Sequence, residues 1–283
     1  MKRVSSRLFP FAACMLLAVA ATAMLAACGS SDSAESLTFE RTTEGKESLL
    51  TVPESAEAGE AEITFVNNGD GPADLQLIRA EGDRTPEEVV DGLAEATSGK
   101  PFPEWFFAAG GAGVTPADGE TTVTQVLEPG TYYAFDTEGS EGPPDASTIT
   151  GMEVTGEESD DSLAGDATIS AFEYGFESEG IAAGENEFVF ENKGVQPHHV
   201  IALKMVGDST IEDVNEFFKS DGGGKPPVEE GPPVGTAVVE GGESQLTSFE
   251  LEPGRYALVC FISDRQGGPP HVVKGMIEEL EVE

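Results

Sequence analysis

The last part of the sequence places a cysteine, a histidine and a methionine in close succession. Cys260 ends an apolar run, His271 follows eleven residues later, and Met276 comes five residues after that. A thiolate, an imidazole and a weakly bound thioether are ligand types of a mononuclear copper electron-transfer site, which also uses a second imidazole. The sequence has three histidines in all, and the other two are His198 and His199. These residue types indicate a copper site near the end of the chain.

The first 28 residues are typical of an export signal. A basic start is followed by an apolar stretch from 9 to 24, and small residues precede Cys28. The sequence Leu-Ala-Ala-Cys at 25–28 resembles the bacterial lipobox, whose cysteine becomes lipid-modified and begins the mature protein. We therefore expect a signal peptide over 1–27, lipidation of Cys28, and a location on the extracytoplasmic face of a bacterial cell membrane. The small polar residues that follow predict a flexible tether over 28–36.

Cysteine usage in the exported part sets Cys260 apart. Cys14 falls within the signal and Cys28 would carry the lipid, so Cys260 is the one thiol that remains free. Exported proteins normally use cysteines in pairs, as disulfides. A role as metal ligand explains an unpaired cysteine. The alternative is a buried cysteine that acts only as a small apolar side chain.

The chain is strongly acidic, with a formal net charge of −38 at pH 7. Nucleic acid is not expected as a partner, because binding to phosphates needs a basic surface. Cations and basic proteins are favoured electrostatically. Most of the carboxylates are expected to form a solvated surface.

An internal repeat divides the exported part into two copies of one unit. The run Phe-Val-Asn-Asn-Gly at 65–69 recurs as Phe-Glu-Asn-Lys-Gly at 190–194, and Leu-Glu-Pro-Gly at 127–130 recurs at 251–254. Self-similarity that keeps a nearly constant offset indicates repeated architecture. We expect a domain over 37–156, an acidic linker over 157–164, and a second domain over 165–283.

Within each copy the pattern favours strands. Short runs rich in β-branched and aromatic residues alternate with clusters of Gly, Pro and Asn, which is typical of an all-β sandwich. One helix is expected after Asp208, where Thr210, Glu212 and Asp213 are followed by Val214, Phe217 and Phe218 at helical spacing. In the second copy the expected strands lie at 188–190, 200–203, 237–239, 246–251, 256–261 and 276–282.

Three segments of the second copy resemble the cupredoxin family, the blue (type 1) copper proteins such as plastocyanin and azurin. They are Pro-His-His-Val-Ile at 197–201, Pro-Gly-x-Tyr-x-Leu-x-Cys at 253–260, and Pro-His-Val-Val-Lys-Gly-Met at 270–276. The resemblance covers Ile169–Glu283. It implies two tandem Greek-key β-sandwiches, each with one short helix. It also implies one copper ion per chain, bound in the second domain.

The same resemblance assigns the ligands. His198 follows a proline as in the plastocyanin pattern and would be the first imidazole, Cys260 the thiolate, His271 the second imidazole and Met276 the axial ligand. His199 stays open as an alternative to its neighbour. The ten residues between Cys260 and His271 are more than plastocyanin has, which leaves the conformation of that loop unspecified.

The first copy lacks these ligands. Ala73 stands at the position of His198, Asp136 at that of Cys260 and Asp145 at that of His271, and only Met152 recurs. The first domain is therefore expected to keep the fold without binding copper.

The expected function is one-electron transfer by a surface-tethered type 1 copper protein. The alternatives are a copper carrier or storage protein, and a structural module without metal. No enzymatic activity is expected, because multicopper oxidases and nitrite reductases need further histidines, and the Gly-x-Ser-x-Gly, Walker and His-Glu-x-x-His motifs are absent from the sequence. The expected partners are the copper ion, a redox protein of basic character, and the membrane through the lipid anchor.

Overall fold

The structure is a computed structural model that describes residues 34–44, 47–136, 146, 149–220, 223–231 and 233–283. Residues 33 to 283 form one compact unit. The expected signal peptide, Cys28 and Asp145 lie outside the described residues. The first strand begins at Glu35, within the range expected to be tether. No helix in the described ranges is long and apolar enough to cross a membrane.

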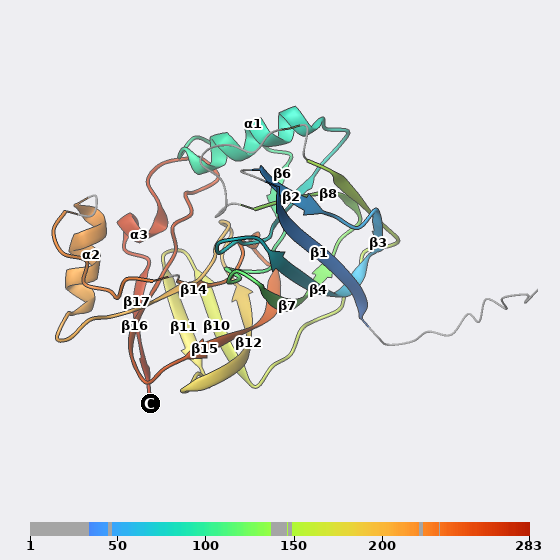
Figure 1. Cartoon of the computed structure of the whole chain (residues 1–283). Coiled ribbons are helices and arrows are strands. Elements are labelled where there is room, and N and C mark those ends of the chain that lie inside the picture. The colour runs from blue at the N-terminus through green and yellow to red at the C-terminus, as the bar shows by residue number, and fades with distance from the viewer. Residues whose placement is uncertain (1–33, 45–46, 137–145, 147–148, 221–222, 232) are drawn as a thin grey trace, which may run out of the picture. The chain divides into compact units, whose positions relative to one another are not determined.

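The first half consists of two sheets and one helix (Figure 1). One sheet has the strand order β7-β4-β1-β2 and the other β3-β9-β8-β5-β6. The elements are β1 (Glu35–Glu44), β2 (Glu47–Thr51), β3 (Ser55–Glu57), β4 (Gly59–Asn68), β5 (Gln76–Ala80), α1 (Pro86–Thr97), β6 (Phe106–Ala108), β7 (Gly119–Leu127), β8 (Gly130–Phe135) and β9 (Gly151–Thr155).

The second half has the same plan, with sheets of order β11-β10-β12-β15 and β14-β13-β16-β17. In both halves the first strand pairs in parallel with a strand that carries the repeated Asn at or next to its end, β1 with β4 and β10 with β12. The elements are β10 (Ala167–Phe172), β11 (Gly175–Glu179), β12 (Gly184–Asn192), β13 (Ile201–Lys204), α2 (Ile211–Lys219), β14 (Val234–Gly235), β15 (Ser244–Leu251), β16 (Gly254–Val259), α3 (His271–Lys274) and β17 (Ile277–Val282).

Each half buries an apolar core between its two sheets. In the second half Phe188 and Phe190 of β12 belong to the same core cluster as Leu258 of β16 and Leu280 of β17. Alternate residues of β12 and β4 point inward, as expected for strands with one face covered. Full burial of a Phe or Leu side chain stabilises a fold by about 1.5–3 kcal/mol. The expected all-β fold of two sandwiches is thus confirmed.

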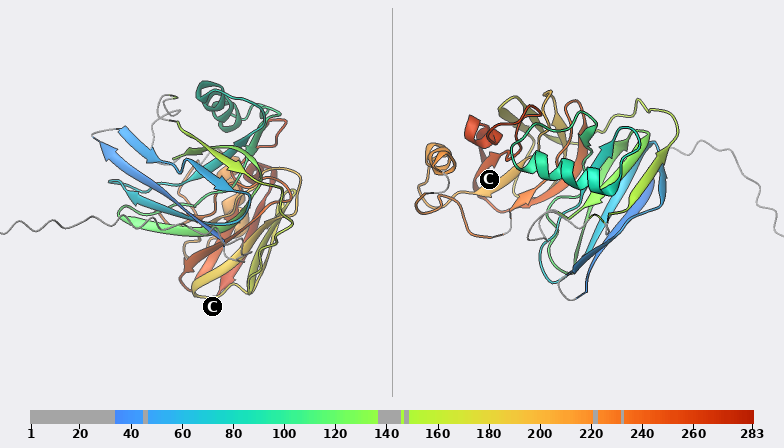
Figure 2. Two further views of the ribbon diagram at one scale, coloured as in Figure 1. Left: turned by 90° about the vertical axis from the view of Figure 1, so that its right-hand side faces the viewer. Right: turned by 90° about the horizontal axis from the view of Figure 1, so that it is seen from above.

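The two halves share one sheet. Strand β15 pairs with β7, with Gln245 opposite Gln125, so that the eight strands β11-β10-β12-β15-β7-β4-β1-β2 are continuous. Figure 2 shows this junction from two further directions, with the blue-to-green strands of the first half beside the yellow-to-red strands of the second. A continuous sheet makes the halves parts of one structure.

The helices follow local rules. Helix α2 begins after Thr210, whose hydroxyl accepts a hydrogen bond from the Asp213 N–H while the Asp213 carboxylate accepts one from the Thr210 N–H. Such a reciprocal cap satisfies two backbone donors that the helix leaves free. The sequence did not indicate the short helix α3. The strand expected at 237–239 is also absent, because Val239 forms only isolated bridges.

Candidate metal centre

Three separate segments bring the expected ligands together. His198 precedes β13 and is held by a backbone bridge to Val239, with N–O distances of 3.0 and 2.9 Å. Cys260 directly follows β16, and His271 is the first residue of α3. The side chains of His198, Cys260 and His271 have no exposed surface.

The donor atoms of these three side chains converge. Nδ1 of His198 lies 3.7 Å from Sγ of Cys260, and Nδ1 of His271 lies 3.5 Å from the same sulfur. The two Nδ1 atoms are 3.0 Å apart. Within the described ranges, this is the one group of three or more His, Cys, Asp or Glu side chains close enough to share a metal ion, with ligand atoms within 4.8 Å of one another.

The distances fit a bound metal ion. Bonds of about 2.0 Å to nitrogen and about 2.3 Å to sulfur, at an angle of about 120°, place the nitrogen and the sulfur about 3.7 Å apart. The observed Sγ–Nδ1 distances are 3.5 and 3.7 Å. Two facing imidazole lone pairs at 3.0 Å repel each other unless a proton or a cation lies between them. A donor set of two imidazoles and one thiolate is the one that copper electron-transfer sites use.

A carboxylate fixes the tautomer of His271. Nε2 of His271 lies 2.9 Å from Oδ1 of Asp264, so Nε2–H donates and Nδ1 presents its lone pair to the site. Asp264 in turn pairs with the Lys274 ammonium, and the Tyr174 hydroxyl donates to it at 3.1 Å. The Tyr174 ring lies edge-on to the His271 ring, with centroids 5.3 Å apart. These three residues cover the outer side of His271.

Burial keeps both imidazoles neutral. It is the largest cause that lowers the pKa of His198, to about 4, and the adjacent His271 contributes. Burial also lowers the pKa of His271, although Asp264 opposes this shift. The Nε2 atom of His198 is buried and has no hydrogen-bond partner in the described part of the chain. At neutral pH both rings are in the form that binds metals.

The thiol of Cys260 is protonated while no cation is bound. Burial raises the pKa of Cys260 to about 12, and backbone amides of His199 and Ile262 that hydrogen-bond to the sulfur oppose this shift. A bound cation would compensate the thiolate charge and displace the proton. The two amides would then stabilise the thiolate.

His199 points elsewhere. Its Nε2 accepts a hydrogen bond from the backbone N–H of Phe261 at 2.9 Å, and its ring lies edge-on to the Phe261 ring. Burial lowers the pKa of His199 to about 3. Of the two neighbouring histidines, the structure thus brings His198 to the cysteine.

Met276 lies in the apolar core of the second half. Its side chain is fully buried in the same cluster as Cys260, and its backbone N–H donates to the His271 carbonyl at 3.0 Å. Gly275 ends α3 with a φ of 100°, a conformation that glycine adopts without strain and that turns the chain into β17.

The residues around His271 were not recognised in the sequence. Asp264, Tyr174 and Lys274 belong to no repeated motif, and one carboxylate among 53 acidic residues carries no distinguishing signal. Asp264 lies between Cys260 and His271 and Lys274 lies three residues after His271, whereas Tyr174 is 90 residues away from Asp264 in the sequence.

Comparisons with known proteins give structural similarities alone. No family model matches the sequence, and no curated protein matches it. Auracyanin B is 23% identical, with a TM-score of 0.29, over 41% of this chain and 86% of its own. The azurin Az-iso2 of Methylomonas sp. strain J is 19% identical, with a TM-score of 0.26, over 41% of this chain and 95% of its own. A multicopper oxidase of Campylobacter jejuni, described as a metallo-oxidase, is 10% identical with a TM-score of 0.26, over 88% of this chain and 64% of its own.

Proposed function

We propose that this protein binds one copper ion in its second half and transfers single electrons. His198, Cys260 and His271 are the ligands, and Met276 is the axial ligand. The observation that carries the proposal is the convergence of two Nδ1 atoms and one Sγ atom, all buried, within 4.8 Å.

The chain's residues supply the fixed surroundings that one-electron transfer requires. Bound copper supplies the Cu(I)/Cu(II) couple, with thiolate and thioether favouring Cu(I) and imidazole suiting both states. The backbone bridge at His198 and the Asp264 carboxylate at His271 hold the two rings in place. Ligands that are held in position limit rearrangement between the two oxidation states.

The histidine content of the chain agrees better with an electron-transfer protein than with a multicopper oxidase. The sequence has three histidines, all within the described residues. Two lie at the site, and the Nε2 of the third accepts a backbone hydrogen bond. Further copper ions of the kind that multicopper oxidases hold would need additional imidazoles.

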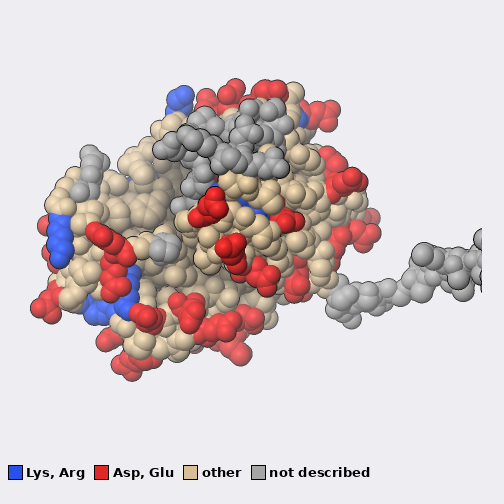
Figure 3. Space-filling model, in the orientation of Figure 1, with Lys and Arg blue, Asp and Glu red and all other residues tan. Residues whose placement is uncertain are grey.

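The location and the partners are part of the proposal. The Leu-Ala-Ala-Cys motif supports lipidation of Cys28 and attachment to the extracytoplasmic face of a bacterial membrane. Acidic side chains spread over the face shown in Figure 3, with few basic ones among them, which favours a basic redox partner. The repeated motifs support an origin of the two halves by duplication.

Titration of the chain without residues 1–28 with Cu(II), followed by visible absorption, tests the proposal. We expect an intense thiolate-to-copper band that saturates at one equivalent. Tight binding of Cu(I) without that band would favour the copper carrier instead. If the protein bound neither ion, the proposal would be wrong and the three side chains would be packing residues.

A further inference from the structure

The loop between Cys260 and His271 lies against the first half of the chain. The backbone N–H of Phe102 donates to the Arg265 carbonyl at 2.8 Å, and the N–H of Gly268 donates to the Gly99 carbonyl at 2.9 Å. Both bonds join the segment after α1 to the loop that connects two expected copper ligands. This loop is the one whose length departs from plastocyanin.

The backbones meet so closely that a side chain would not fit. Gly267 has a φ of 82°, and a Cβ atom on it would lie 2.8 Å from the Gly99 carbonyl oxygen. Contacts of Cβ atoms below 3.0 Å essentially never occur. The loop therefore follows the surface of the first half rather than extending into solvent.

Arg265 is the main side chain in this contact. Its guanidinium donates to the Pro103 and Phe106 carbonyls at 3.3 and 3.0 Å, and it lies over the Phe107 ring at 4.9 Å. All three partners belong to the first half. The guanidinium also pairs with Glu240 at 2.9 Å, with exposures of 18% and 15% for the two side chains. Charged hydrogen bonds that are partly shielded from water are stronger than exposed ones.

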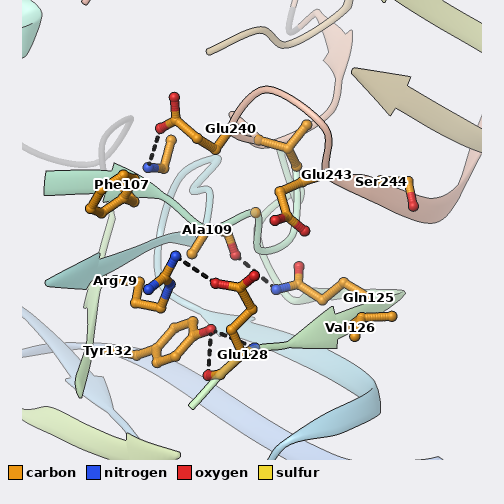
Figure 4. Close-up of a pocket in the computed structure, with 13 residues that line it drawn as sticks. Arg79, Phe107, Ala109, Gln125, Val126, Glu128, Tyr132, Glu240, Glu243 and Ser244 are labelled. Carbon is orange, nitrogen blue, oxygen red and sulfur yellow. Dashed lines mark hydrogen bonds and ion pairs between the residues drawn. The ribbon is translucent and has the colours of Figure 1, made fainter. Parts of the chain in front are cut away.

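The Glu240 carboxylate itself joins the halves. It accepts a hydrogen bond from the Ala108 N–H at 3.2 Å, shown as a dashed line in Figure 4. In the same view Phe107 lies beside this contact, and Arg79 and Glu128 of the first half form an ion pair nearby. Through Glu240, Arg265 is thus connected to the contact between β6 and the loop before β15.

Arg265 is linked to both imidazole ligands through neighbouring residues. The preceding residue, Asp264, binds Nε2 of His271 at 2.9 Å. The backbone N–H of Arg265 donates to the Gln196 side chain at 2.7 Å, two residues before His198. A short path of contacts therefore runs from the aromatic residues of the first half to the site.

We infer that the first half braces the loop between Cys260 and His271 through Arg265, which is a positioning residue for the copper site. This inference rests on the proposed function. It gives the ligand-free half a role: it closes the buried site and slows the loss of copper. The loop, which lies wholly within the described residues, contains no strand or helix of its own, and such segments open locally unless neighbouring elements hold them.

The first test needs no metal. Alkylation of Cys260 by iodoacetamide, located by peptide mass spectrometry on the whole chain, reports opening of the site, because the thiol has no exposed surface. We expect Arg265→Ala to accelerate alkylation about ten-fold, from the loss of several charged hydrogen bonds. Arg84→Ala is the matched control. Arg84 also lies over an aromatic ring, Trp105, and pairs with a carboxylate, Glu88, within the first half.

The second test uses the copper-loaded chain. We expect Arg265→Ala to release copper to a chelator about ten-fold faster and to shift the thiolate-to-copper band, whereas Arg84→Ala does neither. Phe107→Ala, a change in the half without ligands, should act in the same direction and non-additively with Arg265→Ala. Arg265→Lys should recover part of the effect, because it keeps the charge without the planar fork.

The outcomes separate the inference from the proposed function. If the wild type binds no copper, the proposed function fails, and the alkylation rates still decide the brace. If Arg265→Ala does not fold, Phe107→Ala supplies both measurements. Alkylation of Cys260 at the wild-type rate in folded Arg265→Ala or Phe107→Ala would overturn the inference.

Discussion

The two halves place different chemistry in the same backbone frame. In the first half Ala73 bridges Thr115 as His198 bridges Val239 in the second. Asp136 stands where the second half has Cys260, and its carboxylate pairs with Nε of Arg41 at 2.7 Å, each side chain being 6% exposed. The first half thus supplies from its own side chain the positive charge that the second half would take from a metal ion.

The frame itself is maintained by the repeated asparagine. Asn67 donates to the carbonyls of Gly71 and Thr115, while its Oδ1 accepts the N–H of Gly69. Asn192 makes the corresponding bonds to Gln196, Val239 and Gly194. The comparison teaches that the hydrogen bonds of the turn determine the frame, and a few side chains determine what it holds.

The largest effect is expected from removing a ligand of the proposed copper site in the second half. Cys260→Ser removes the soft ligand, so we expect the intense visible band to disappear and Cu(I) affinity to fall by about 100-fold or more. Because serine is nearly isosteric, circular dichroism should show an intact fold. A variant that kept the blue band would contradict the assignment of Cys260.

The next largest effect is expected from disrupting the Arg41–Asp136 ion pair of the first half. Arg41→Met removes the guanidinium that pairs with the buried Asp136 carboxylate, and we expect the free energy of unfolding to fall by about 3–5 kcal/mol. The double variant Arg41→Met with Asp136→Asn should recover much of this loss in urea unfolding. Copper retention by the folded single variant should match the wild type, since the pair belongs to the other half.

A smaller effect is expected from weakening the hydrogen bond between Asp264 and His271. Asp264→Asn weakens the hydrogen bond that orients the imidazole, so copper affinity should fall about ten-fold. The reduction potential should rise, because a less basic imidazole stabilises Cu(II) less. Titration with a competing chelator and voltammetry measure the two changes. Asp213→Asn at the cap of α2 is the matched control, and an equal loss of affinity there would remove the special role of Asp264.

The smallest effect is expected at Glu243, beside the contact between the two halves. Burial, together with Glu128 and Glu240, raises the pKa of Glu243. A carboxyl group with a raised folded-state pKa adds stability below its unfolded pKa and loses it as pH rises through the folded value. Glu243→Gln should therefore stabilise the protein at pH 7 by less than about 1 kcal/mol after solvent screening, and by less still at pH 4. Urea unfolding at the two pH values measures this, and an unchanged difference would mean that Glu243 is fully solvated.

Local patterns predicted much of the fold. The repeat and the β-rich runs indicated two sandwiches, and the helical spacing of Val214, Phe217 and Phe218 indicated α2. The pairing of β15 with β7 was not predictable, because it depends on which strand edges remain open after each half folds. The run 237–239 has strand composition, but neighbouring backbone meets it only at isolated bridges.

The candidate site also contains residues that the sequence predicted and residues that it did not. Ligand types and order pointed to His198, Cys260 and His271, which the structure brings together. Asp264 and Arg265 lie in a loop without periodicity or repetition, and the repeat gave Asp136 a position without a partner. The contacts of Arg265 with the first half and of Arg41 with Asp136 arise from tertiary packing between distant parts of the chain. Such contacts leave no signal at the level of single residues.

Anomalous X-ray diffraction at the copper edge, from crystals grown with copper, tests the central claim most directly. We expect one strong peak between Nδ1 of His198, Sγ of Cys260 and Nδ1 of His271, and none beside Arg41 and Asp136. A copper peak beside Arg41 and Asp136, or copper bound only at positions away from Cys260, would contradict the proposed site.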